Sequence, residues 1–239
     1  MHLKSSTTPH AKKLKSNRPT SHSIEMTLPR RRHLVLLAGL LVLVVVAATA
    51  TASTDSSSTT AVAVDFVRRS CRSTEYPRVC ETTLVPCAAS VGRSPRRLAR
   101  AALVVGADRA RNCSAYIHGS RSGSGGAMKD CAELARDAED RLRQSAAEME
   151  RMGRAGTPRF AWSLSNVQTW ASAALTDTST CLDSLAQHKD RGRGGKGSDG
   201  DDDAVRVKRR VVAVAQATSN ALALVNRLQP ATHRQRLLL

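Results

Sequence analysis

The sequence predicts an all-α protein: an up-down-up-down four-helix bundle with a helical hairpin on its N-terminal side, stapled by disulfide bonds. Hydrophobic residues make up 41% of the 239 residues but aromatic residues only 3%, so Ala, Val and Leu must form the core. β-Sandwiches and barrels depend on aromatic and β-branched strand residues, whereas an Ala-rich chain suits closely packed helices. Apolar spacing and cysteine spacing lead to the same fold.

Four long segments repeat apolar or small residues at alternating steps of three and four, the seam of antiparallel helices packed at shallow angles. The first begins at Ser94-Pro95, an N-cap followed by a proline in the first turn, and stops at Gly119. The predicted stripes are Ala99, Leu103, Gly106, Ala110, Cys113 and Ile117; Ala127, Cys131, Leu134, Ala138, Leu142, Ser145, Met149 and Met152; Leu164, Val167, Ala171, Ala174, Thr178, Cys181 and Leu185; and Val207, Val211, Val214, Thr218, Ala221, Val225 and Leu228.

Breaks between these stripes are rich in glycine. We expect a loop from Gly119 to Gly126, a turn from Gly153 to Pro158, and a surface loop from His188 to Asp203, which holds five glycines and no apolar residue. The last helix must end before Pro230.

The N-terminal region has the pattern of a secretory signal. Three arginines at 30–32 precede an uncharged run from Leu34 to Ala52, whose strictly apolar part ends at Ala48 and is too short to favour a membrane span. Ala48-Thr49-Ala50 is a small-residue cleavage motif. An uncleaved signal anchor is the alternative, and only that case implies membrane attachment. Translation from Met26 would give a signal of ordinary length, so residues 1–25 need not be translated.

These features predict four regions: an extension with the signal at 1–52, a Ser/Thr-rich linker at 53–60, the bundle domain at 61–229, and a tail at 230–239. Residues 53–239 would then lie outside the cytosol, where cysteines oxidise.

The six cysteines test the predicted topology, because residues equidistant from the turn of an antiparallel hairpin face each other. The midpoint in sequence between Cys131 and Cys181 is Gly156, which lies inside the expected turn. Both cysteines also lie on core stripes. Cys71 and Cys80 are centred on the stretch before Pro77, which reads as a turn. The spacing therefore predicts the disulfides Cys131–Cys181 and Cys71–Cys80.

The midpoint between the other two cysteines, Cys87 and Cys113, lies within a predicted helix and not in a turn, so the spacing does not support their pairing. They are equally compatible with a third disulfide and with free thiols. Asn112 begins the N-glycosylation sequon Asn-Cys-Ser, although its place in a predicted helix disfavours occupancy.

Several motifs resemble those of the plant invertase/pectin methylesterase inhibitor family. They are Cys71 and Cys80 with Tyr76-Pro77 between them, the segment Leu98–Leu103, Asp130-Cys131-Ala132-Glu133-Leu134, the run from Asn166 to Asp177 followed by Thr180-Cys181-Leu182-Asp183, and Ser219–Val225. The resemblance covers residues 61–229 and is closest to the pectin methylesterase inhibitor branch. It implies a disulfide-stapled four-helix bundle that is not an enzyme and that occludes the active cleft of a cell-wall enzyme.

Under this resemblance we expect a secreted inhibitor of pectin methylesterase that binds one-to-one in the apoplast and needs no cofactor. Candidate contacts on the third bundle helix lie off its apolar stripe: Asn166, Thr169, Trp170, Thr176, Asp177 and Thr180. For both tryptophans, Trp162 and Trp170, core or edge packing is the favoured interpretation, and Trp170 is also a candidate anchor. The alternative target is acid invertase, whose inhibitors are reported to use a Pro-Lys-Phe segment; Pro158-Arg159-Phe160 occupies that place here.

A second alternative follows from charge. The formal net charge is +17, and residues 53–239 alone hold 29 Lys/Arg against 19 Asp/Glu, which favours weak contact with pectin and allows a basic wall-binding protein without an enzyme target. Secretion and the lack of aromatic platforms argue against nucleic acid. The chain has no nucleophile elbow, no placed Cys/His pair and no metal-ligand spacing, so we predict neither catalysis nor a metal site.

Overall fold

The computed structural model describes residues 39, 58–120, 126–191 and 198–229. Apart from residue 39, the predicted signal, its cleavage motif and the tail lie outside the described residues. The chain divides into two compact units, Met1–Thr51 and Ala52–Leu239, and the second holds the whole fold described below. Within the described residues there are helices and turns but no strands, as the all-α prediction requires.

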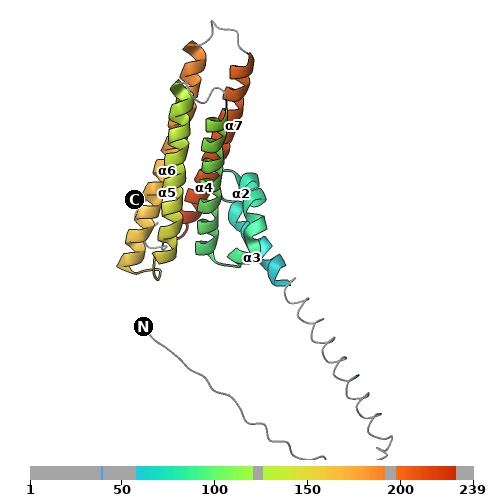
Figure 1. Cartoon of the computed structure of the whole chain (residues 1–239). Coiled ribbons are helices and arrows are strands. Elements are labelled where there is room, and N and C mark those ends of the chain that lie inside the picture. Colours follow the sequence, from blue (N-terminus) through green and yellow to red (C-terminus); the bar gives the residue numbers. More distant parts are fainter. Residues whose placement is uncertain (1–38, 40–57, 121–125, 192–197, 230–239) are drawn as a thin grey trace, which may run out of the picture. The chain divides into compact units, whose positions relative to one another are not determined.

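Four long helices form the bundle: α4 (Pro95–Gly119), α5 (Gly126–Arg151), α6 (Pro158–Arg191) and α7 (Ser198–Asn226). Each packs against its neighbours in the cyclic order α4, α5, α6, α7, and α7 returns to α4. Figure 1 shows these four helices running side by side and alternating in direction. This is the up-down-up-down arrangement expected from the short connections between the stripes.

The predicted stripes form the core. Every stripe residue on α4 is buried, and so are six of the seven on α6. Small side chains let the helices approach closely: a methyl group added at Gly106 of α4 would lie 3.2 Å from Cδ1 of Leu142 on α5. Glycine at this position therefore fixes how near α4 and α5 can come.

The start of α4 is fixed by the cap that the sequence predicts. The Ser94 side chain accepts a hydrogen bond from the backbone N–H of Arg97, and Pro95 occupies the first helical turn. Together they satisfy an N–H that has no partner within the helix and preset the backbone angle.

The N-terminal hairpin consists of a helix over residues 58–71, α2 (Pro77–Leu84), the short 3-10 helix η1 (Val85–Cys87) and α3 (Ala88–Val91). The disulfide Cys71–Cys80 joins the end of its first helix to α2, with Cα atoms 5.5 Å apart. In Figure 1 the hairpin lies on the side of the bundle formed by α4 and α7, and α2 contacts both helices.

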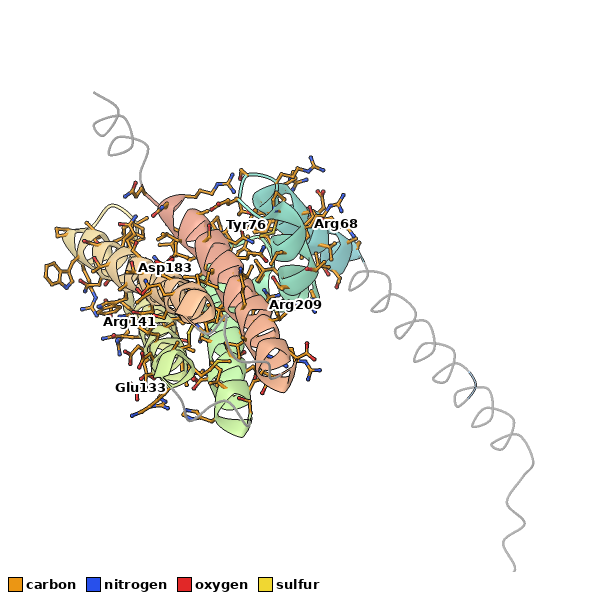
Figure 2. The ribbon with its side chains drawn as sticks, turned by 90° about the horizontal axis from the view of Figure 1, so that it is seen from above. Arg68, Tyr76, Glu133, Arg141, Asp183 and Arg209 are labelled. Atoms are coloured by element: carbon orange, nitrogen blue, oxygen red, sulfur yellow. A yellow bond between two sulfur atoms is a disulfide. The ribbon has the colours of Figure 1, made fainter. Side chains whose placement is uncertain are left out.

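A single buried amide holds the hairpin turn against α7. Asn220 Oδ1 accepts from the backbone N–H of Tyr76 at 2.9 Å, while Asn220 Nδ2 donates to the carbonyl oxygen of Tyr76 at 2.9 Å. The Asn220 side chain is 2% exposed, so these two bonds replace water for both backbone groups. Figure 2 shows Tyr76 where the hairpin meets α7.

Two predicted boundaries are wrong. Residues 58–60 are already helical, so the linker expected to reach residue 60 ends earlier. The loop expected from His188 to Asp203 is shorter, because α6 continues to Arg191 and α7 starts at Ser198. Apolar residues are needed only where a helix faces the core, so their absence marks the end of the packed region and not the end of the helix.

We predict that Asn220→Ala lowers the free energy of unfolding by about 2–4 kcal/mol, because it leaves two buried backbone groups of Tyr76 without partners. Chemical denaturation with the disulfides intact measures this. Asn226→Ala is the matched control: Asn226 is exposed on the same helix and accepts one hydrogen bond from Gln168, so its loss should cost under about 1 kcal/mol. Equal losses of unfolding free energy in the two variants would contradict the role given to the hydrogen bonds between Asn220 and Tyr76.

Candidate partner-binding surface

The outward face of α6 carries the surface most suited to a partner. Its residues recur mostly at steps of three and four, on the side of the helix opposite the core stripe. We call them the α6 stripe: Trp162, Ser165, Asn166, Thr169, Ser172, Thr176, Ser179 and Thr180. All are exposed except Asn166, which is half-buried. No Asp, Glu, Lys or Arg occurs from Phe160 to Thr176, so most of the stripe is uncharged.

Hydroxyl side chains of the stripe are fixed to their own helix. Thr169 donates to the carbonyl of Ser165, Thr176 to that of Ser172, and Thr180 to that of Thr176, at 2.9, 3.2 and 3.0 Å. Ser179 donates in the same way to Leu175. These bonds favour one rotamer for each of the four side chains and leave an oxygen lone pair open, and the three threonines also present a methyl group. The stripe is therefore ordered before any partner arrives.

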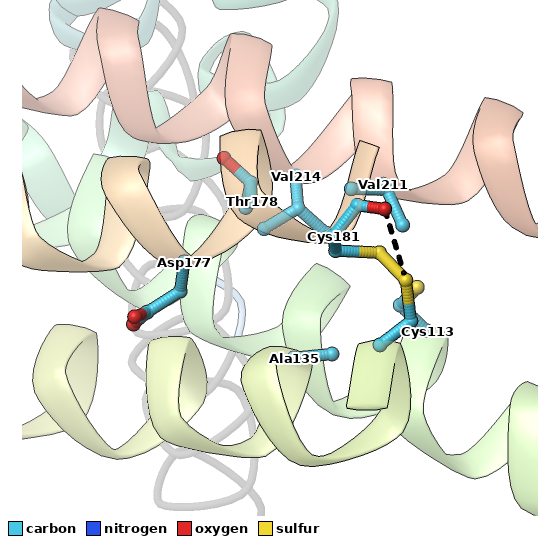
Figure 3. Close-up of a pocket in the computed structure, with 8 residues that line it drawn as sticks. Cys113, Ala135, Asp177, Thr178, Cys181, Val211 and Val214 are labelled. Atoms are coloured by element: carbon cyan, nitrogen blue, oxygen red, sulfur yellow. Dashed lines mark hydrogen bonds between the residues drawn. A yellow bond between two sulfur atoms is a disulfide. The ribbon is translucent and has the colours of Figure 1, made fainter. Parts of the chain in front are cut away.

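The helix that carries the stripe is joined covalently to its neighbour. Cys181 of α6 forms a disulfide with Cys131 of α5, with Cα atoms 4.8 Å apart, which is the pairing that the midpoint argument predicts. Closing a loop of this length, with the two cysteines 50 residues apart, stabilises a fold by about 4 kcal/mol. The dashed line in Figure 3 marks the 3.2 Å approach of Cys131 Sγ to the carbonyl oxygen of Cys181.

An ion pair joins the same two helices one turn away. Arg141 on α5 donates to Asp177 on α6 at 2.6 Å, and the Asp177 side chain is 12% exposed. The sequence places Asp177 among the candidate contacts, and this placement is wrong because the carboxylate faces α5. Burial raises the pKa of Asp177, with Asp137 adding to the effect, although Arg141 opposes it.

The two tryptophans have different environments. Trp162 is 70% exposed, so the expected core or edge packing is wrong for this residue. Trp170 is half-buried, next to the stripe, which fits edge packing. The sequence contains a signal that separates them. Trp162 lies four residues before Asn166 and seven before Thr169, so helical spacing places it on the same outward face as these two residues.

The segment Pro158-Arg159-Phe160 begins α6. Pro158 and Arg159 are exposed, but Phe160 is 3% exposed and lies under the guanidinium of Arg96, 5.7 Å from its ring centroid. Phe160 therefore belongs to the core and is not an available contact. Its place follows from the core stripe, since it precedes Leu164 by four residues.

The remaining cysteines are thiols. Cys87 is half-buried in η1, and Cys113 is buried beside the α5–α6 disulfide. Figure 3 shows Cys113, Cys181, Val211 and Val214 lining one small interior gap. Burial raises the pKa of the Cys113 thiol to about 11, with Arg210 opposing, so this thiol stays protonated and unreactive at neutral pH. Asn112 is exposed on α4, and its glycosylation stays a prediction.

Comparison with known proteins identifies the family. Residues 65–224 match the family described as plant invertase/pectin methylesterase inhibitor. The chain belongs to this family. It is 40% identical over 173 residues to the "21 kDa protein" of Daucus carota, covering 70% of this chain and 84% of that protein.

Two further relatives come from Arabidopsis thaliana. Pectinesterase inhibitor 9 is 40% identical over 174 residues, covering 67% of this chain and 79% of the relative. Pectinesterase inhibitor 11 is 39% identical over 171 residues, covering 69% and 80%. No solved structure matches the chain.

No group of three or more His, Cys, Asp or Glu in these ranges could hold a metal ion. No helix in the described ranges is long and apolar enough to span a bilayer. The α6 stripe exposes indole and hydroxyl groups, and its Asn166 amide is half-buried.

We predict that Asp177→Asn alters stability in a pH-dependent way. Because the pKa of Asp177 is raised on folding, its charge opposes folding above that pKa, and the penalty disappears as pH falls towards the ordinary value of 3.8. The stability of the variant relative to the wild type should therefore decrease between pH 7 and pH 4, as measured by urea unfolding.

Asp183→Asn is the control, since Asp183 is exposed on the same helix. A difference between Asp177→Asn and wild type that stays constant with pH would contradict the assigned burial.

Proposed function

We propose that this protein inhibits pectin methylesterase by laying the α6 stripe over the opening of the enzyme's substrate cleft. Family membership supports the class of activity, and the printed names of two relatives, pectinesterase inhibitors 9 and 11, favour the esterase over invertase as the target. The observation that carries the proposal is the stripe itself, an uncharged and preordered row of exposed side chains.

Order in the free protein matters because each side chain that is immobilised on binding loses conformational entropy. For rotamer-rich side chains this loss costs about 0.5–1.5 kcal/mol of binding free energy each. Along the stripe this cost is small, since Ser and Thr have one side-chain torsion and their hydroxyls are already bonded to α6. Trp162 contributes the large exposed aromatic surface that is frequent among interface hot spots. Ordering of these side chains would therefore subtract little from the affinity of the complex.

The neutral character of the stripe also favours a close fit. A charged side chain that loses water without gaining a partner costs several kcal/mol, and there is none between Phe160 and Thr176. The outward surfaces of the other bundle helices differ: α5 exposes Lys129, Asp130 and Asp140, among other charges. On this basis α6 is the docking helix and the disulfide to α5 keeps it straight and fixed.

Inhibition in this scheme requires no reaction. The bundle covers the cleft and excludes the polymer, burying about 1,600 Å² in total if the complex has the usual size. We propose a one-to-one complex in the cell wall, reached through the secretory signal of residues 30–52. Asn166, Thr169, Trp170, Thr176 and Thr180 remain the contact residues of the proposal; Trp162 joins them, and Asp177 and Phe160 do not.

Acid invertase is the second target of the family and stays an alternative. Its proposed contact segment would offer only Pro158 and Arg159, because the Phe160 ring is covered by Arg96. This burial weakens the case for the invertase branch, so the esterase is the function we propose.

We predict that Thr176→Arg weakens inhibition of plant pectin methylesterase at least about tenfold, equivalent to 1.4 kcal/mol, because it places an unpaired charge within the stripe. Thr82→Arg is the matched control: Thr82 is also exposed, is bonded to a carbonyl of its own helix, and lies on α2 in the hairpin. Titration of esterase activity with each purified protein gives both stoichiometry and affinity.

Loss of inhibition in Thr82→Arg alone would place the contact on the hairpin. Full inhibition by Thr176→Arg, or no inhibition of any plant esterase by the wild type, would refute the proposal.

A further inference from the structure

One end of the bundle concentrates arginines and has few acidic residues near it. The end includes the start of α4 and the turn between α5 and α6, and its six arginines are called here the arginine end: Arg93, Arg96, Arg97, Arg151, Arg154 and Arg159. Five are exposed and Arg96 is half-buried. No acidic residue occurs from Thr82 to Ala107 or from Arg151 to Thr176. The two segments of the chain that meet at this end therefore contain basic residues and no acidic residues.

Contacts between α4, the turn and α6 hold Arg96, Arg151 and Arg159 at the same end of the bundle, and Arg93, Arg97 and Arg154 lie within three residues of them along the chain. Arg96 donates to the carbonyl oxygen of Gly153, and its guanidinium also covers Phe160 of α6. Arg159 donates through Nε to the carbonyl oxygen of Arg151 at 3.1 Å. Residues from α4, from the turn and from α6 are thus held together at one end of the bundle.

Most of the charge on this surface remains available. The bonds of Arg96 and Arg159 go to neutral carbonyl groups, so neither guanidinium is neutralised. The nearby acids are already engaged: Glu148 accepts from Ser163 at 2.5 Å and from Arg151 at 3.2 Å, and Glu150 pairs with Arg100. Within the described ranges, Arg93, Arg97 and Arg154 make no ion pair.

An aromatic platform adjoins the arginines. Trp162 follows Arg159 by three residues on α6, so the two side chains are neighbours on the helix surface. The indole is 70% exposed. Trp offers a broad apolar ring face together with an N–H donor, and Arg offers a planar fork that matches a carboxylate. A ligand that satisfies both would carry carboxylates on a chain of rings with apolar faces.

We propose that the arginine end and Trp162 form a binding site for a polyuronate, an anionic polysaccharide with a carboxylate on its sugars. Carboxylates pair with Arg93, Arg97 and Arg154, and the face of one sugar stacks on the Trp162 indole. The choice of polymer rests on the proposed function, because hydrolysis of pectin methyl esters by the target enzyme creates uronate carboxylates. The inhibitor would then be retained on stretches of polymer that the enzyme has already processed.

The test measures binding of the purified full chain to a short unesterified oligogalacturonate by calorimetry, with no esterase present. Arg93→Gln/Arg97→Gln/Arg154→Gln should weaken binding about tenfold, since each exposed ion pair contributes a few tenths to one kcal/mol. The control Arg72→Gln/Arg78→Gln/Arg111→Gln removes equal charge from exposed arginines elsewhere and should change affinity less than about threefold. Trp162→Ala should weaken binding at unchanged charge.

Equal losses in the two triple variants would overturn the proposal, since the attraction would then be diffuse. So would equal binding of a fully methyl-esterified oligomer, which has no carboxylates. Tight binding of polyglutamate that is insensitive to Trp162→Ala would assign the surface to an acidic protein instead. Thr176→Arg should leave oligogalacturonate affinity nearly unchanged, so a failure of this site and a failure of the proposed inhibition remain distinguishable.

Discussion

The covalent link between α5 and α6 at Cys131–Cys181 is the constraint on which the rest of the molecule depends. A core built from Ala, Val and Leu gives each helix little contact area, so helix positions need support beyond packing. The disulfide and the Arg141–Asp177 pair supply it within one turn of α6. At the other side of the bundle, Cys71–Cys80 and the Asn220 amide hold the hairpin turn against α7. Both sets of contacts join segments that the apolar seam alone would leave free to slide.

The rigid bundle allows α6 to present an ordered surface for docking. Its inward face is fixed by buried small residues, and its outward hydroxyls are fixed by bonds to the carbonyls one turn before them. A surface prepared in this way loses little entropy on docking. The same helix begins at the arginine end, so a neutral contact surface and a basic surface meet at Trp162. The two surfaces suit different ligands, a protein for the first and a carboxylate polymer for the second.

Much of this structure follows from sequence alone, because seam periodicity and cysteine midpoints report the same geometry. The stripes of α4 and α6 and both disulfide pairs are as expected. Contacts between side chains far apart in the sequence could not be predicted in this way. Nothing near Asp177 in the sequence indicates that it pairs with Arg141, and nothing near Asn220 indicates that it bonds to the backbone of Tyr76. The misplaced Phe160 and Trp162 have another cause. Phe160 precedes Leu164 by four residues and Trp162 precedes Asn166 by four, so the first turn of α6 continues the core and surface spacing of the turns that follow it.

The central claim, that α6 is the surface that meets the esterase, is tested most directly by hydroxyl-radical footprinting of the complex. Trp162 is 70% exposed and highly reactive, so its oxidation reports its own solvent contact. The account predicts that adding pectin methylesterase strongly reduces oxidation of Trp162, while Tyr76 at the hairpin is oxidised as before. Unchanged oxidation of Trp162 in a saturated complex, with protection of Tyr76 instead, would contradict it.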